Sequence, residues 1–378
     1  MNGEERGSGG DIPLSGCLCG HSAAAGPRTH SQMSGRRVGF CLSHKKRRRM
    51  NLDAFADFCA GHGVEVVEID LTQPLVPQGP FDVIVHKLSD VIVEAEHDSQ
   101  SQQLLANFQS YVSAHPSTVI LDPLPAMTQL LDRFASYRIM SKLHNSLRDW
   151  RICSPPYLEI NSASDLSSIQ QAVMTQGLSF PLICKTRVAH GSLSHEMSLI
   201  FSAGSLADIH PPCLLQSFVN HGAVLHKVFV VGDRHFYVER PSLKNFPSGP
   251  CDRKTIFFNS HQVSKPESSS DLTALDEQMP CLPPPSSEAV AALVKELRVQ
   301  LGMALFGVDV IINIHTHTLT VIDINIFPGY EGVPLFFSSL LSHIEYVLDK
   351  QTSAGPQATG SPESAQTTSG PSPATTGL

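Results

Sequence analysis

Two apolar segments near the C-terminal end of the chain constrain its fold most, because only a short connection separates them. They read "LFGVDVIIN" (residues 305–313) and "LTVIDINIF" (residues 319–327). Their length and their content of β-branched residues predict two strands, and the short turn allows the strands to pair as a hairpin. The chain must therefore build a sheet around this pair.

Three polar residues interrupt these strands: Asp309, Asp323 and Asn325. Side chains two apart on a strand share a face, so Asp323 and Asn325 converge while the intervening isoleucines face the other side. In a hairpin, Asp309 can lie opposite them. A single Asp would be explained by capping of a strand end, but three oxygen donors followed by a Pro-Gly turn favour a magnesium site.

Zinc is a weaker alternative, because neither Cys nor His has the spacing of a zinc site nearby. His315 and His317 fall in the turn between the two strands, and we expect both to be exposed.

The first third of the folded chain alternates strand and helix patterns, which predicts an open α/β domain. "RRVGFCL" (residues 36–42) is the first predicted strand, and five cations follow it at residues 45–49. Such a run is usually a solvated loop or a targeting signal. Ligands in open α/β sheets bind beyond the carboxyl ends of the strands, so its position favours a functional role.

The rest of the charge pattern limits the partners. The net charge is −8 over 378 residues, which predicts neither nucleic acid nor membrane as the general partner. No apolar run is long enough for membrane insertion. The nine cysteines contain no CxxC pair, so a reducing compartment fits best, and we expect a cytoplasmic protein.

The middle of the chain holds two lysines within apolar strand patterns, Lys185 in "LICKTRV" and Lys227 in "VLHKVFVV". Because a buried lysine needs an anionic partner, two of them suggest a shared anion. The segment "VAHGSLSHEM" (residues 188–197) could cradle a phosphate or could be a solvent loop. The sequence has no P-loop and no protein-kinase motif set.

Two helices flank this region in the sequence pattern. Met127, Leu130, Phe134 and Tyr137 share one face of a predicted helix. A second predicted helix has Ser287 as its N-cap, an apolar face from Val290 to Leu301, and Gly302 as its C-terminal stop.

Several of these motifs together resemble one family, the inositol-tetrakisphosphate 1-kinases, also called inositol 1,3,4-trisphosphate 5/6-kinases. The resemblance is carried by "VGFCLSHKK", "LDPLPAMTQLLDR", "ICKTRVAHGSLSHEM", "RPSLKNF", "IFFNSHQVSKPESSS" and "VIDINIFPGYEGV", and it runs from about residue 35 to about residue 348. It implies an α/β fold of the ATP-grasp type. In that fold two lobes enclose the nucleotide, and an N-terminal Rossmann-like domain helps to hold the substrate.

The resemblance also implies roles for individual residues. The catalytic residues would be Lys185, Lys227 and Asp323. The metal ligands would be Asp309, Asp323 and Asn325. ATP would contact Arg133, Lys185, the stretch from Gln216 to Lys227, Ser242, Ser260 and Ser264. The inositol phosphate would contact Lys46, His195, Lys227, Asn325 and Gly329.

The expected domains follow from the element pattern and the resemblance. They are a disordered leader (1–34), an N-terminal α/β substrate-side domain (35–125), a central ATP-grasp lobe (126–230), a C-terminal ATP-grasp lobe with the metal site (231–350) and a disordered tail (351–378).

The function implied is an ATP- and magnesium-dependent kinase of inositol polyphosphates, with two magnesium ions, acting as a monomer. The resemblance implies phosphorylation of inositol 1,3,4-trisphosphate at the 5 or 6 position and of inositol 3,4,5,6-tetrakisphosphate at the 1 position, and also phosphate exchange between inositol phosphates. Two alternatives remain: an ATP-grasp ligase that joins a carboxylate to an amine, and an inositol phosphate-binding protein with weak catalysis. The second arises because Ile326 replaces a small alanine of the family pattern beside a proposed metal ligand.

Overall fold

The computed structural model describes residues 19–20, 35–163, 165–274 and 282–353. Apart from Cys19–Gly20, the predicted leader lies outside the described residues, and so do residues 354–378 of the predicted tail. Residues 351–353 belong to the last helix, α10 (Phe336–Ser353). The prediction of disorder in these two segments is therefore not tested.

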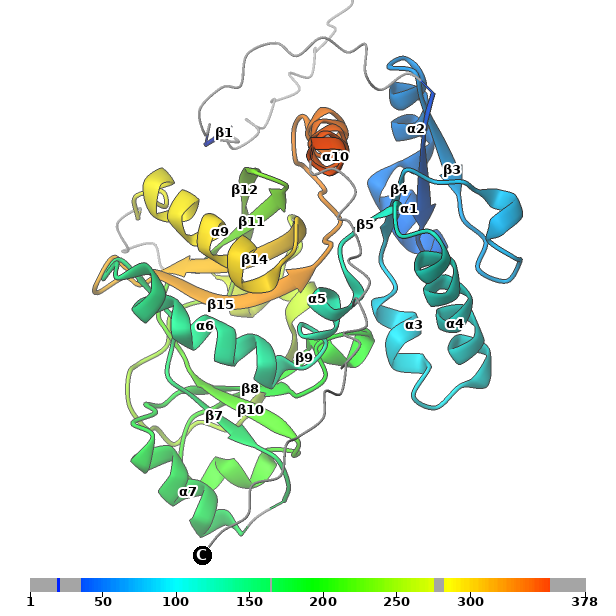
Figure 1. The fold of residues 1–378 in the computed structure, drawn as a ribbon. Helices are drawn as coiled ribbons and strands as arrows, with labels where there is room; N and C mark the ends of the chain where they lie inside the picture. Colours follow the sequence, from blue (N-terminus) through cyan, green and yellow to red (C-terminus); the bar gives the residue numbers. More distant parts are fainter. Residues whose placement is uncertain (1–18, 21–34, 164, 275–281, 354–378) are drawn as a thin grey trace, which may run out of the picture.

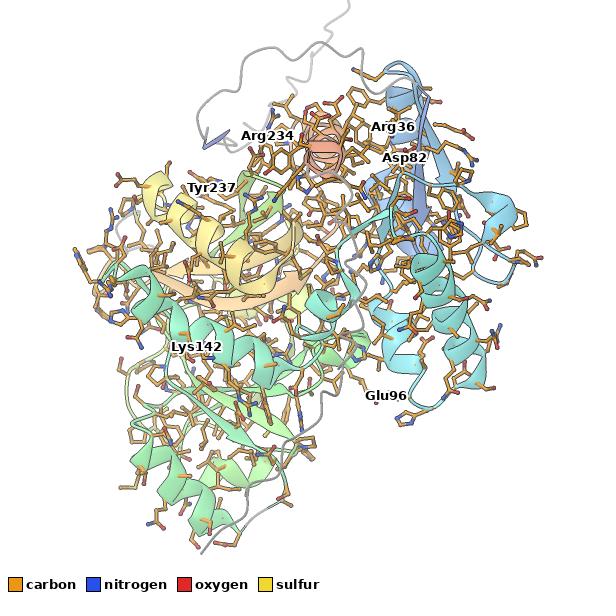
Figure 2. The ribbon with its side chains drawn as sticks, viewed as in Figure 1. Arg36, Asp82, Glu96, Lys142, Arg234 and Tyr237 are labelled. Carbon is orange, nitrogen blue, oxygen red and sulfur yellow. The ribbon has the colours of Figure 1, made fainter. Side chains whose placement is uncertain are left out.

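The first part of the chain forms a four-stranded parallel sheet in the order β3-β2-β4-β5. Its strands are β2 (Arg36–Cys41), β3 (Val64–Glu68), β4 (Val83–His86) and β5 (Val119–Leu121). Its helices are α1 (His44–Met50), α2 (Leu52–Ala60), α3 (Ser89–Glu94) and α4 (Ser99–Ala114). An ion pair of 2.6 Å between Arg36 and Asp82 links the start of β2 to the start of β4 (Figure 2). The predicted open α/β domain is thus confirmed.

This strand order places the basic run at a ligand-binding position. β2 has β3 on one side and β4 on the other, so its carboxyl end is a switch point of the sheet. Helix α1 begins there, because the Ser43 side chain accepts a hydrogen bond from the backbone of Lys46. All five cations of residues 45–49 lie on this one short helix.

The middle of the chain forms a five-stranded antiparallel sheet in the order β13-β9-β8-β10-β7. Its strands are β7 (Tyr157–Ile160), β8 (Leu182–Thr186), β9 (Glu196–Ile200), β10 (Cys213–Ser217) and β13 (Ile256–Asn259). Helix α7 (Leu166–Thr175) packs on it through Ile169 and Val173, and this lobe forms the lower part of Figure 1.

The third sheet has six strands in the order β1-β12-β11-β14-β15-β6. They are β1 (Cys19–Gly20), β6 (Ile152–Cys153), β11 (Val224–Val231), β12 (Arg234–Pro241), β14 (Leu305–Ile312) and β15 (Leu319–Ile326). The expected lobe boundary at residues 230 and 231 falls inside β11, and where the lobes divide stays a prediction.

Helices cover both faces of the six-stranded sheet (Figure 1). Helices α6 (Arg133–Leu147) and α9 (Ser287–Leu301) share a hydrophobic cluster with one face. Helix α10 and the N-terminal domain share a second cluster with the other face. Tyr237 of β12, labelled in Figure 2, packs in the first of these clusters.

Two details of the helix predictions were wrong. The single helix predicted through Met127 and Tyr137 is two helices, α5 (Leu124–Thr128) and α6, because the Asp132 side chain accepts from the Phe134 backbone and starts a new helix. The N-cap of α9 is Ser286 rather than Ser287. Gly302 does end this helix, in the left-handed conformation.

A buried carboxylate joins the first sheet to the third. Asp122 follows β5 and accepts hydrogen bonds from the backbone N–H groups of Ala304 (2.8 Å) and Leu305 (2.9 Å). Since Leu305 begins β14, this contact fixes the N-terminal domain to the strand that carries Asp309.

Candidate active site

The hairpin of β14 and β15 brings the predicted metal ligands together. The two strands are antiparallel, with Asp309 paired to Asp323 and Gly307 paired to Asn325. The predicted position of Asp309 opposite Asp323 is therefore confirmed. The turn histidines, His315 and His317, are exposed as predicted and do not line the cavity described below.

A bulge lies beside this pair. The register shifts between Asp309 and Val310, which leaves Ile322 of β15 without a partner on β14. The Ile322 carbonyl accepts from Lys185 Nζ at 3.0 Å. Bulges often occur next to active sites, where they redirect groups away from the ladder. Here the bulge provides an acceptor for a buried lysine.

Lys185 is buried on β8 and has two hydrogen-bond acceptors. Besides the Ile322 carbonyl, Nζ donates to the Tyr137 hydroxyl at 2.6 Å, and that hydroxyl donates to the Gln216 side-chain oxygen. Burial lowers the pKa of Lys185 to about 8, although the nearby Asp323 carboxylate acts in the opposite direction. The ammonium group is thus held close to the hairpin without an ion-pair partner.

The second predicted lysine does have an ion-pair partner. Lys227 of β11 is paired in register with Asp309, and its Nζ lies 3.0 and 3.2 Å from the two carboxylate oxygens. Lys227, Asp309 and Asp323 therefore form a row across three neighbouring strands, and we call this set the central row. Its alternating charge offsets the repulsion between the two carboxylates.

Arg133 holds part of the segment at residues 188–197, which the sequence analysis considered as a possible phosphate-binding loop. Its guanidinium donates to the backbone carbonyls of Thr186, Val188 (3.4 Å) and Ser194 (3.2 Å), and its Nε has no partner. This buried side chain fixes the path of residues 186–194.

Lys46 turns inward from α1 and is buried. Its Nζ donates to the carbonyls of Phe327 (3.0 Å) and Pro328, and it lies 3.8 Å from the centre of the Phe327 ring. Lys87, which follows β4, donates to the same Phe327 carbonyl at 3.3 Å. Burial lowers the pKa of both lysines. Two cations of the N-terminal domain thus meet the loop after β15.

A cavity of about 840 Å³ brings these features together. Every site residue that was predicted individually lines it, whereas the predicted stretch from Gln216 to Lys227 lines it only in part. These residues are Lys46, Arg133, Lys185, His195, Gln216, Lys227, Ser242, Ser260, Ser264, Asp309, Asp323, Asn325 and Gly329. Nine lysines and arginines but only four carboxylates line the cavity, whereas the whole chain is acidic. Such a cavity attracts anions strongly.

Sequence reasoning missed several of the lining residues. Lys87 and His261 had no signal of their own, and Arg49 was not separated from the other cations of its run. The structure places the His261 ring 5.4 Å from that of His195, a contact between segments that are far apart in the sequence. Burial is the main cause that lowers the pKa of both histidines. Ser242 is held by a hydrogen bond of 2.7 Å with His221 Nε2.

The donor set of the hairpin fits a hard divalent cation. Within the described ranges, no three His, Cys, Asp or Glu side chains are grouped so that they could hold a metal ion by themselves. Two facing carboxylates with one amide oxygen leave the remaining positions to water or phosphate oxygens, as magnesium prefers. In the part of the chain that the structure describes, no helix has the length and apolar content needed to cross a membrane.

Comparison with known proteins agrees with this arrangement. Residues 37–127 match the model of the inositol 1,3,4-trisphosphate 5/6-kinase pre-ATP-grasp domain, and residues 146–346 match that of the ATP-grasp domain of the same family. The chain is 53% identical to an inositol-tetrakisphosphate 1-kinase of Xenopus laevis (84% of this chain, 80% of the relative). It is 52% identical to one of Danio rerio (85% and 82%).

Solved structures with much lower identity share the overall fold. The D-cycloserine synthetase DcsG superposes with a TM-score of 0.52 at 12% identity, over 83% of this chain and 99% of that one. The D-alanine–D-alanine ligase of Bacillus anthracis gives 0.51 at 11% identity, over 85% and 99%. The chain belongs to the inositol 1,3,4-trisphosphate 5/6-kinase family, and its fold is the ATP-grasp fold.

Proposed function

We propose that this protein is an ATP- and magnesium-dependent kinase that phosphorylates hydroxyl groups of inositol polyphosphates. The observation that carries the proposal is the position of the central row. It lies in one cavity with nucleotide-side residues from the five-stranded sheet and with cations from the N-terminal domain. Phosphoryl transfer depends on charge stabilisation and on the positions of donor and acceptor, which such an arrangement supplies.

The nucleotide side is built from the two ATP-grasp sheets. We assign the phosphates of ATP to Lys185, Lys227 and the loop held by Arg133. Gln216, Ser242, Ser260 and Ser264 also line the cavity and are the further ATP contacts that the family resemblance implies. Lys185 suits a phosphate because it is buried and has only neutral acceptors, so an entering anion strengthens its charged form.

Asp309, Asp323 and Asn325 are the residues that would hold the metal. Bound magnesium would offset the charge on the terminal phosphates of ATP. We expect two magnesium ions to bind at this site. The hairpin fixes the three donors before any ion arrives, since the strand register and the Asp122 contact both position β14.

The substrate side has the cations that a polyphosphate requires. We assign the inositol phosphate to Lys46, His195, Lys227, Asn325 and Gly329. Arg49, Lys87 and Arg240 also line the cavity and add positive charge, and we call these three residues together with Lys46 the substrate wall. A molecule with several doubly ionisable phosphates loses much hydration on binding, and charge-assisted hydrogen bonds replace it. A loose transition state needs little activation of the attacking hydroxyl.

The finer assignments are those that the family resemblance implies, and they stay predictions. We expect inositol 1,3,4-trisphosphate to be phosphorylated at the 5 or 6 position and inositol 3,4,5,6-tetrakisphosphate at the 1 position. We also expect phosphate exchange between inositol phosphates, a monomeric enzyme and a cytoplasmic location.

The test is to incubate the protein with ATP, magnesium and each of these two inositol phosphates, and to separate the products by chromatography. New, more highly phosphorylated inositols with matching ADP support the proposal. ADP formed only with pairs of amino acids would make the protein a ligase. Binding without ADP would make it a catalytically weak binder. Ile326, the residue that raised this last alternative, packs against both hydrophobic clusters of the six-stranded sheet.

A further inference from the structure

The loop after β15 places an extra carboxylate in the substrate wall. Four carboxylates line the main cavity: Asp90, Asp309, Asp323 and Glu331. Two of these are the proposed metal ligands. Glu331 lies among cations instead, and its Oε1 is 3.6 Å from Arg49 Nε. At this distance, and with 41% and 59% of the two side chains exposed, the ion pair is weak.

The carboxylate of Glu331 covers the residue that we assign to the substrate. A methyl group placed on Gly329 would lie 2.8 Å from the carboxyl carbon of Glu331 and 2.9 Å from each of its oxygens. A substrate phosphate that approaches the Gly329 backbone from this side would therefore meet the carboxylate first. A phosphate bound to the Gly329 backbone on this side would occupy the position of the Glu331 carboxylate.

The backbone of Glu331 is held, but its side chain has space to move. Arg240 donates to the Glu331 backbone carbonyl at 3.4 Å. Arg49, Gly329 and Glu331 also line a second cavity of about 500 Å³. The side chain can thus leave the first cavity without a movement of the loop.

The charge around Glu331 explains why a carboxylate is tolerated there. Lys46 and Lys87 are both buried nearby, and burial lowers the pKa of both. The Glu331 charge acts in the opposite direction on the pKa of Lys46, while Lys87 and Arg49 lower it further. Without a substrate, Glu331 therefore offsets the mutual repulsion of these cations.

We infer that Glu331 is a displaceable internal anion, which pairs with Arg49 until a substrate phosphate takes its place. This inference rests on the proposed function. Glu331 then limits how tightly the polyphosphate is held. The most highly phosphorylated molecules should bind less tightly to the wild type than to a protein with the same nine cations and no carboxylate at residue 331. Easier release of the product follows from the same competition.

The test compares Glu331→Gln with Glu68→Gln. Both wild-type carboxylates pair with an arginine of α1, and both are similarly exposed (59% and 56%), but Glu68 does not line the cavity. The probe is inositol hexakisphosphate, which has no free hydroxyl and reports binding without turnover. Calorimetry at low salt should show about three- to fivefold tighter binding to E331Q, and no change for E68Q.

The dependence of probe binding on ionic strength distinguishes an effect of charge from an effect of side-chain shape. The advantage of E331Q should shrink as ionic strength rises from about 0.05 M to about 0.5 M, because a charge effect is screened and a steric effect is not. In steady-state turnover, E331Q should have a lower KM than the wild type. It should also have a lower kcat where product release limits the rate. In an Arg49→Gln background the E331Q change should have less effect.

Equal binding of the probe by wild type, E331Q and E68Q, with matching thermal unfolding, would overturn the inference. That result is distinct from failure of the proposed function, in which the wild-type protein itself neither binds the probe nor phosphorylates an inositol phosphate. An advantage of E331Q that persists unchanged at high salt would also contradict it.

Discussion

The Ile322 carbonyl shows how one inserted residue builds the nucleotide side of the site. Ile322 is the extra residue of the bulge and has no partner on β14, and its carbonyl accepts from Lys185. A buried ammonium without such an acceptor would carry a large desolvation cost. The carbonyl and the lysine come from different sheets, so this hydrogen bond joins the two lobes beside the central row.

Asp323 provides the most direct test of the metal assignment. Asp323→Asn keeps the side-chain oxygen that accepts from the Ile324 backbone at 3.0 Å, but removes the charge. We expect kcat/KM for phosphorylation to fall at least about a hundredfold, because the stabilisation of phosphate charge is lost. The measurement is ADP release, with thermal unfolding to show that the fold is intact.

The matched control is Asp149→Asn, which removes a carboxylate paired with Arg151 and outside the cavity. It should leave kcat/KM close to the wild-type value. Wild-type turnover by D323N would remove Asp323 from the metal site.

The lowered pKa of Lys185 predicts that the protein takes up protons when ATP binds. Burial lowers its pKa to about 8 in the free protein, and a phosphate beside it should raise the pKa again. At pH 8 about half a proton should therefore be taken up for each ATP bound. Calorimetry in two buffers of different ionisation enthalpy measures this number. In Lys185→Arg, which stays protonated, the heat should not depend on the buffer.

The same shift sets a pH dependence of stability. The unfolded lysine keeps its proton up to its ordinary pKa of 10.5, whereas the folded one loses it near pH 8. The unfolded state therefore binds more protons between these values, and this residue adds stability as the pH rises from 8 toward 10.5. A buffer-independent heat of ATP binding by the wild type would contradict the assignment of Lys185.

At the scale of elements, the site depends on how the N-terminal domain meets the β14–β15 hairpin. Lys46 and Lys87 reach the loop after β15 from one side, and Asp122 holds the start of β14 from another. These contacts join segments that are far apart in the sequence. They fix the substrate wall relative to the central row.

Asp122→Ala should weaken this connection. It leaves the buried N–H groups of Ala304 and Leu305 without their acceptor, and each unsatisfied donor costs about 1–3 kcal/mol. We expect the free energy of unfolding to fall by about 2–4 kcal/mol, with Asp122→Asn intermediate because it keeps one acceptor oxygen. Chemical denaturation measures the change.

Glu65→Ala serves as the comparison, since it removes only an exposed partner of Arg37 in the same domain. A D122A protein that is as stable as E65A would show that the Asp122 contact does not hold the two parts together.

The sequence predicted the elements better than the contacts between them. The hairpin was predictable because its apolar pattern is local, and so was the end of α9, because Gly302 adopts a left-handed conformation. The bulge at Ile322 has no local signal, since "TVIDIN" is consistent with a regular strand.

The site residues divide in the same way. Asp309, Asp323 and Asn325 followed from strand periodicity, whereas the serines and His195 came from the resemblance to a family. The inward turn of Lys46 could not be predicted from its surroundings in the sequence, because its partner Phe327 lies 281 residues away. Long-range packing alone decides which cation of the basic run is buried.

For the whole molecule, the important property is the contrast between an acidic chain and a basic cavity. The net charge is −8, yet nine cations and four carboxylates line the cavity. The field of the whole protein repels anions, and the cavity attracts them. Binding of a polyphosphate should therefore depend on the few cations that line the cavity rather than on net charge.

Two cations of α1 allow the role of the cavity lining to be tested. Lys45 and Arg48 are both exposed, but only Lys45 lines the cavity. When ionic strength rises from about 0.05 M to about 0.5 M, the KM of the wild type for the inositol phosphate should rise about tenfold or more, since exposed charges are strongly screened. Lys45→Gln should raise this KM about threefold at low salt and make it less sensitive to salt. Arg48→Gln removes the same charge from the same helix and should change neither value. Equal effects of K45Q and R48Q on steady-state kinetics would mean that net charge, and not the lining of the cavity, governs how the substrate is captured.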